Sequence, residues 1–172
     1  MRDFNRIVRY LAYGLELLVL FMLQEVPGLT PVVFGARPVL IFPAVITMAM
    51  FEEEVPALFF GVLGGLFCDL GLSGSMGFHA LVLGVLCFFI SLLVRLSMQN
   101  NLVTALLTGV WAIGLTVLAQ WLFLYRFTYG EAGFALTHHY LPKYFYTMLF
   151  VPLVYLLNRG LYRALRTEDS PL

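Results

Sequence analysis

Long apolar runs separated by short polar stretches fill the chain from one end to the other. A helix that crosses the roughly 30 Å of bilayer hydrocarbon needs about twenty residues, because each residue advances it by about 1.5 Å. Six runs approach this length, so the pattern predicts six transmembrane helices in a single integral membrane domain, residues 1–172. The predicted spans are 9–26, 30–51, 55–72, 77–96, 102–125 and 143–162.

The second predicted span is irregular. Its clean apolar part, 39–51, is too short to cross a bilayer upright. Residues 28–38 are therefore expected to form a non-helical or re-entrant start, which a membrane tolerates only where protein or water satisfies the backbone. Prolines, a glycine and an arginine interrupt the run, at Pro31, Gly35, Arg37, Pro38 and Pro43.

Composition strengthens the membrane interpretation. Of the 172 residues, 61% are hydrophobic and 12% are charged, whereas a soluble domain is about half apolar and about a quarter charged. A core of this size cannot bury such a surplus, so a bilayer must cover it. The net charge is zero, which leaves no basic field to bind nucleic acid. The fold class is therefore an all-α polytopic membrane protein with lipids as its surroundings.

Orientation follows from the basic residues that flank the spans, because cytoplasmic loops carry an excess of Lys and Arg. With six spans, both termini lie on one side of the membrane. That side would hold Arg2, Arg6, Arg9, Arg95, Arg159, Arg163 and Arg166, and the other side Arg37, Arg126 and Lys143. Both termini are therefore predicted to be cytoplasmic.

The span 55–72 carries small residues on one face. Gly61, Gly65 and Asp69 are four residues apart, with Gly64 and Cys68 beside them. Small residues at this spacing let a neighbouring membrane helix approach closely. We therefore predict packing roles for the glycines of this span and of the turn after it: Gly61, Gly64, Gly65, Gly71, Gly74 and Gly77.

Asp69 lies near the outer end of that span, on the glycine face, so its carboxylate should point into protein. At mid-span an acid costs about 3 kcal/mol to insert, and less near the interface. Two interpretations stay open: Asp69 caps backbone N–H groups of the glycine-rich turn 71–77, or it couples a proton or an ion. His79, near the start of the next span, is a candidate hydrogen-bond partner.

Two other groups of titratable residues stand out. Glu16 is an acid about halfway along the first span, predicted to be buried against Tyr, Thr or Asn groups that the sequence does not identify. His138 and His139 share the loop 126–142 with Glu131, but nothing there fixes three or four metal ligands. No metal and no cofactor are expected.

An acidic loop, Glu52 to Glu54, separates the second and third spans. The carboxylates could stabilise the positive end of the following helix. Alternatively, they could form a docking patch for a basic segment of a partner.

Motifs for catalysis are absent from the chain. It contains no G-x-S-x-G, H-E-x-x-H or phosphate-binding loop, and no paired acids at helical spacing. The sequence therefore predicts a protein that is not an enzyme.

The motifs resemble those of the rod shape-determining protein MreD family. In that family the third span and the turn after it run approximately G-x-x-x-G-L-L-x-D-x-x-S-G-x-x-L-G-x-x-A-L. The resemblance is best over 24–96, and the length and six-span layout agree with the family over the whole chain. The residues that carry it are Gln24, then Arg37-Pro38-Val39-Leu40, Gly64-Gly65-Leu66-Phe67-Cys68-Asp69 and Ser73-Gly74-Ser75-Met76-Gly77-Phe78-His79-Ala80-Leu81.

The resemblance implies a scaffold of the cell-elongation machinery in the bacterial inner membrane, which supports lateral peptidoglycan synthesis. It implies binding to the single-span protein MreC, and through it to MreB, the elongation transpeptidase and its SEDS glycosyltransferase. It also implies a fold similar to the substrate-binding subunits of energy-coupling-factor transporters. The alternative function is therefore a small-molecule, vitamin-like binding subunit of a transporter.

A partner's single helix is expected to lie in an outer groove of the bundle, with its external domain on a rim built from 27–38, 70–77 and 126–142. The candidate rim residues are Arg37, Pro38, Arg126 and Glu131.

Overall fold

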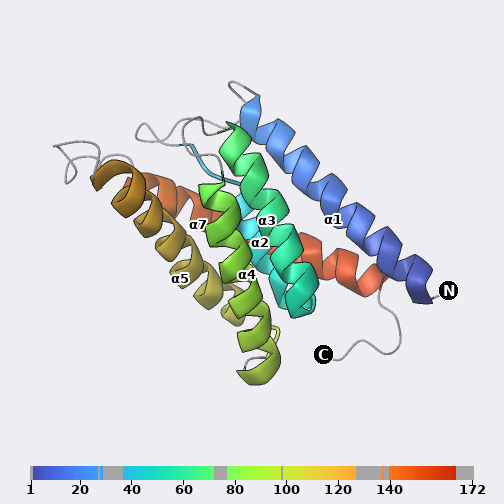
Figure 1. The fold of residues 1–172 in the computed structure, drawn as a ribbon. Coiled ribbons are helices and arrows are strands. Elements are labelled where there is room, and N and C mark those ends of the chain that lie inside the picture. The colour runs from blue at the N-terminus through green and yellow to red at the C-terminus, as the bar shows by residue number, and fades with distance from the viewer. Residues whose placement is uncertain are drawn as a thin grey trace.

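The computed structural model describes residues 2–26, 28, 37–71, 77–97, 99–126, 137 and 140–165. Within these ranges the chain is helical and contains no strand, as the apolar pattern predicted. Figure 1 shows the helices as one bundle, with α1 along one side and α5 along the other. The elements are α1 (Arg2–Glu25), α2 (Ile41–Phe51), α3 (Glu54–Gly71), α4 (Phe78–Ser97), α5 (Leu102–Gln120), the π-helical turn η1 (Trp121–Arg126) and α7 (Leu141–Ala164).

Four of these helices are long and apolar enough to cross a membrane: α1, α3, α4, and α5 with its continuation into η1. The bounds of α3 and α4 lie within one residue of the predicted spans 55–72 and 77–96. Helix α7 has 24 residues, but its prolines, tyrosines and basic residues lower its hydropathy. Helix α2 has only 11 residues. Four helices thus have the length and hydropathy needed to cross a membrane, whereas α2 is too short and α7 is not apolar enough.

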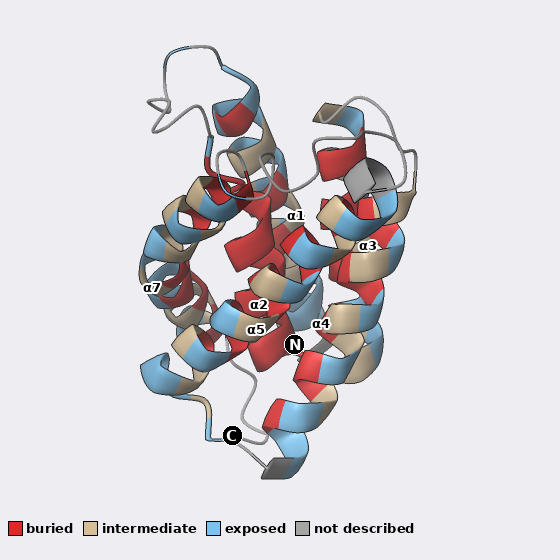
Figure 2. Cartoon of the chain, turned by 90° about the vertical axis from the view of Figure 1, so that its left-hand side faces the viewer, coloured by how far each residue is buried: buried red, intermediate tan, exposed pale blue. Residues whose placement is uncertain are grey.

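Helix α2 forms the centre of the bundle. Residues Ile41–Met50 are all buried, and α1, α3, α4, α5 and α7 all pack against it. Figure 2 shows α2 as a buried column surrounded by helices with exposed outer faces. A helix that is apolar on every side is stable only when other elements cover it completely. The irregular second span therefore provides the core of the fold rather than a lipid-facing helix.

The C-terminal end of α2 is satisfied by side chains of its neighbours. At its C-terminal end, Ser91 Oγ donates to the Glu52 carbonyl at 2.6 Å and Asn100 Nδ2 donates to the Met50 carbonyl at 2.9 Å. Just before its N-terminal end, Val39 N donates to Thr147 Oγ1 at 3.1 Å. Since the last carbonyls of a helix have no partners within it, these bonds make a short buried helix tolerable.

Helices α3 and α4 approach each other at the glycine face. A Cβ added at Gly61 would lie 2.7 Å from the Leu83 carbonyl oxygen, and one at Gly65 would collide with the backbone of Ala80. Gly64 faces the other way, towards Val45 of α2. The three glycines thus place α3 against both α4 and the central helix.

Replacing Gly65 by Ala should destabilise the protein by about 1–3 kcal/mol, because the new methyl group meets backbone that cannot rotate away. Gly14→Ala is the matched control, since Gly14 is also helical and an added Cβ there meets no atom within 4 Å. The control should be neutral or slightly stabilising. Thermal unfolding in mild detergent, followed by labelling of the buried thiols Cys68 and Cys87, measures both. Equal unfolding midpoints for the two variants would contradict the close packing.

Candidate functional site

Asp69, near the C-terminal end of α3, ties that helix to the start of α4. Its Oδ2 accepts from Gly77 N at 3.0 Å and from Ala80 N at 3.2 Å. Its Oδ1 accepts from His79 N at 3.1 Å and pairs with His79 Nδ1 at 2.7 Å. The hydrogen bond expected between His79 and Asp69 is therefore present, and both side chains are buried.

This arrangement is a helix N-cap supplied from the preceding helix. The first N–H groups of α4 have no partners within α4, and a carboxylate beside them is favourable because the N-terminus of a helix carries partial positive charge. Of the two interpretations of Asp69, the geometry agrees with the capping one: the carboxylate satisfies three backbone N–H groups of the turn and of α4's first turn.

The other predicted packing glycines differ in their surroundings. A Cβ added at Gly71 would collide with the Glu25 side chain of α1, so Gly71 lies at a contact between helices. Gly77 has a different role from the predicted one: nothing lies within 4 Å of an added Cβ, and its φ is +91°. Glycine is favoured there because the left-handed turn strains any residue with a Cβ. Gly74 lies outside the described residues.

Glu16 is half-buried, which corrects the prediction of a buried acid, and its carboxylate is bonded by Asn158 of α7 beside the central helix. Asn158 Nδ2 donates to Glu16 Oε1 at 3.3 Å and to Thr47 Oγ1 at 2.9 Å. Asn158 and Thr47 are fully buried. Helical spacing alone could not identify these partners, because they come from helices that are distant in the sequence.

The structure also brings two polar residues towards His79 that the sequence did not single out as site residues. Lys143 of α7 and Gln120 of α5 are 5% and 9% exposed, and Lys143 Nζ donates to Gln120 Oε1 at 3.4 Å. The rings of Phe78 and Phe123 lie 6.2 Å apart, which brings the end of α5 and its continuation η1 beside the start of α4. Four helices thus contribute to one buried polar group, formed by Asp69, His79, Gln120 and Lys143, which we call the outer cluster.

At the opposite end of the bundle, each of the three consecutive acids pairs with an arginine of the same chain. Figure 1 shows the start of α1 and the start of α3 at one end of the bundle. The Glu54 side chain is 22% exposed and the Glu53 side chain 61%, whereas Glu52 is buried. The pairs are Glu52 with Arg9, Glu53 with Arg6, and Glu54 with Arg95. Glu54 lies in the first turn of α3, in agreement with the interpretation that these acids stabilise the positive end of that helix. The docking interpretation stays a prediction, and the three carboxylates contact arginines of α1 and α4.

The pair of Arg9 and Glu52 is the buried one. Arg9 Nη2 donates to Glu52 Oε2 at 3.1 Å, and Arg9 Nε lies 2.5 Å from Glu52 Oε1. The Arg9 guanidinium also lies 5.2 Å from the centre of the Tyr162 ring of α7. Burial raises the pKa of the Glu52 carboxyl, while the neighbouring arginine acts in the opposite direction. This pair joins α1, α7 and the end of α2.

The predicted partner rim is only partly visible. Arg37 is exposed. Pro38 is buried, which corrects its assignment to an exposed rim. The side chain of Arg126, and Glu131 with the two loop histidines, lie outside what the structure describes.

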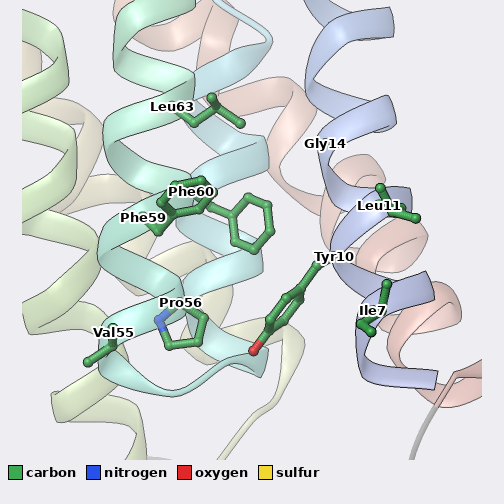
Figure 3. Close-up of a pocket in the computed structure, with 9 residues that line it drawn as sticks. All are labelled: Ile7, Tyr10, Leu11, Gly14, Val55, Pro56, Phe59, Phe60 and Leu63. Atoms are coloured by element: carbon green, nitrogen blue, oxygen red, sulfur yellow. The ribbon is translucent and has the colours of Figure 1, made fainter. Parts of the chain in front are cut away.

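An apolar groove of about 500 Å³ runs along the outer face of the bundle between α1 and α3. Figure 3 shows the side chains of the two helices along it, with the Tyr10 and Phe60 rings between them, 5.6 Å apart at their centres. Gly14 widens the groove, since nothing stands within 4 Å of its added Cβ. The lining residues are Ile7, Tyr10, Leu11, Gly14, Val55, Pro56, Phe59, Phe60 and Leu63.

Within the described ranges, no three His, Cys, Asp or Glu residues come together as metal ligands. Cys68 and Cys87 are free and buried.

Comparisons of the chain with protein-family models, with curated proteins and with solved structures give no match. Its function is therefore inferred from its own residues and their geometry.

Asp69→Asn should cost about 1–3 kcal/mol of stability, because the amide nitrogen would face N–H donors that now meet a carboxylate oxygen. Glu54→Gln serves as the control, since that carboxylate is paired near the surface and its loss should cost less than about 1 kcal/mol. Thermal unfolding in detergent measures both. Normal stability of Asp69→Asn together with loss of function in cells would instead favour proton or ion coupling.

Arg9→Met should destabilise the protein by about 3–5 kcal/mol, because it leaves the buried Glu52 carboxylate without its partner. Adding Glu52→Met to that variant should recover much of the loss, since no uncompensated charge then remains. Arg6→Met is the control: Arg6 and Glu53 are 52% and 61% exposed, and their pair should contribute about 0–1 kcal/mol. A double variant no more stable than Arg9→Met alone would be evidence against this view of the pair.

Proposed function

We propose that this chain is a non-enzymatic membrane scaffold of the MreD type in the cell-elongation machinery of a bacterium. In this role it holds a single-span partner, MreC, and supports lateral peptidoglycan synthesis. Through that partner it would connect to MreB, the elongation transpeptidase and the SEDS glycosyltransferase.

The observation that carries the proposal is the geometry of the motif on which the resemblance rests. Gly61 and Gly65 bring α3 and α4 together, and Asp69 closes the turn between them through Gly77, His79 and Ala80. The residues of the motif therefore act as one structural unit, whose function is to hold two membrane helices in a fixed relation. A motif of this kind suits a protein that serves as a rigid frame for others.

The groove between α1 and α3 supports the choice of a helical partner. It is lined by apolar and aromatic side chains, and Phe59 in it is 59% exposed. Its lining runs over about two turns of each helix, from Ile7 to Gly14 and from Val55 to Leu63. A single apolar helix can pack into such a groove, and Gly14 permits the close approach on which membrane helices depend.

The proposed location is the inner membrane, with both termini in the cytoplasm. The start of α1 and the end of α7 lie at one end of the bundle, where the Arg9 guanidinium stacks on Tyr162. Arg6, Arg9 and Arg95 gather at the same end. An excess of basic residues at one end favours that end as the cytoplasmic one.

Affinity purification of the tagged protein from its native host, with mass spectrometry of proteins and small molecules, tests the proposal. We expect stoichiometric recovery of a protein with one transmembrane helix and a large external domain. Recovery of ATPase subunits or of a vitamin-sized ligand, with no such partner, would replace the scaffold by the transporter subunit.

Filling the groove tests where the partner binds. Gly14→Trp should abolish recovery of the single-span partner while the protein accumulates normally, because the indole occupies the space between α1 and α3. Gly160→Trp is the matched control: Gly160 is an exposed helical glycine of α7 with nothing within 4 Å of an added Cβ. Equal partner recovery from both variants would exclude this groove.

A further inference from the structure

The contact between Glu16 and Asn158 leaves two enclosed oxygen atoms without a hydrogen-bond partner. Glu16 is half-buried as a residue, but its Oε2 atom is enclosed and accepts no bond from the described residues. Asn158 is fully buried, and its Oδ1 atom has no partner there either. Each of these atoms shares a carbon with an atom of the bond from Asn158 Nδ2 to Glu16 Oε1. Since an ionised carboxylate and an amide oxygen only accept, this contact lacks a donor.

The hydrogens nearest to the contact are already in use. The Thr47 hydroxyl donates to carbonyls of its own helix, those of Pro43 at 2.7 Å and Ala44 at 3.0 Å. The two hydrogens of Asn158 Nδ2 are taken by Glu16 Oε1 and Thr47 Oγ1. None of these side chains therefore has a hydrogen left for Glu16 Oε2 or Asn158 Oδ1.

Glu16 also has no cation as its partner. It lies close to the middle of the apolar segment Phe4–Glu25 of α1, where an ionised side chain is costly and normally pairs with an opposite charge. Among the described residues, no basic group forms an ion pair with it. On α1 itself, Arg9 is bound to Glu52, and Tyr13 is fully buried one turn before Glu16.

The titratable groups of the helices that pack against α1 are engaged elsewhere. These helices are α2, α3 and α7, and α2 carries no titratable residue. Near Asn158 on α7, Tyr155 donates to the Asn100 carbonyl, the Tyr162 ring faces the Arg9 guanidinium, and half-buried Arg159 makes no ion pair with Glu16. On α3, both acids pair with residues of α4 and the thiol is buried; these groups are Glu54, Asp69 and Cys68.

We propose that Glu16 and Asn158 form a proton-binding site inside the membrane domain. One proton from the solvent binds to Glu16 Oε2, which becomes an O–H donor, and Asn158 Oδ1 is its acceptor. The acid then accepts through Oε1 and donates through Oε2, so both unpartnered oxygens are used and the charge is removed from the apolar interior. A proton needs no cavity. The neutral pair joins α1 to α7 and, through Thr47, to the central helix.

Infrared spectroscopy of the purified full-length protein in a neutral detergent tests this site, which does not depend on the proposed scaffold role. A protonated carboxylic acid has a C=O stretching band that an ionised carboxylate lacks, and D2O shifts it. At neutral pH we expect the wild type to show such a band and Glu16→Gln to lose it. Glu54→Gln is the matched control and should keep the band, because the Glu54 carboxylate is paired with Arg95 near the surface.

Thermal unfolding of the same proteins gives an independent measurement. At neutral pH the midpoint of Glu16→Gln should lie within a few degrees of that of the wild type, because glutamine accepts through one atom and donates through the other, as the protonated acid does. Between about pH 6 and about pH 9 the wild-type midpoint should fall by a few degrees relative to that of Glu16→Gln. The native wild type binds a proton that its unfolded state has released, so rising pH favours unfolding.

The opposite results are equally clear. A carboxylic-acid band that is unchanged in Glu16→Gln overturns the site, and so does a Glu16→Gln protein that fails to fold or is much less stable at neutral pH, since an ionised Glu16 would then have a structural role. A wild-type midpoint that rises with Na+ over K+ at equal ionic strength, with the response lost in Glu16→Gln, overturns the proton and assigns a bound sodium ion instead.

Discussion

The fold depends on burying a helix that is too short to cross a membrane. Helix α2 has 11 residues, about half the length needed to span the hydrocarbon, and five helices surround it. Both of its ends lie inside the bundle, where water does not satisfy backbone groups. The neighbours must therefore bring polar side chains to those ends, as Ser91 and Asn100 do for its last carbonyls and Thr147 does just before its start.

This constraint explains why buried polar residues lie at both ends of α2, in addition to the Asn158 and Thr47 pair along its side. At the C-terminal end of α2, Glu52 is neutralised by Arg9, so that level is closed and holds α1 in place. At the N-terminal end, Asp69 pairs with His79, and Lys143 donates to Gln120. The first level has the character of a structural joint.

Helices α3 and α4 approach each other closely. Because Gly61 and Gly65 leave no room between α3 and α4, these two helices are packed backbone to backbone. Helix α1 lies beside α3 with a largely exposed apolar face, and the groove between them faces outward. A partner helix bound in this groove would contact α1 and α3 without displacing the residues buried around α2.

The sequence by itself determined which segments are helices and where α3 and α4 begin and end, because apolar length and flanking turn residues are local properties. It also predicted the contact of His79 with Asp69, since a short turn brings them together. It did not determine that Pro38 and Lys143 are buried, or that Asn158 donates a hydrogen bond to Glu16. Nor did it determine that the three consecutive acids each form an ion pair with an arginine. Those outcomes depend on how each helix is rotated and which helix lies beside it, and only the packing around α2 decides that.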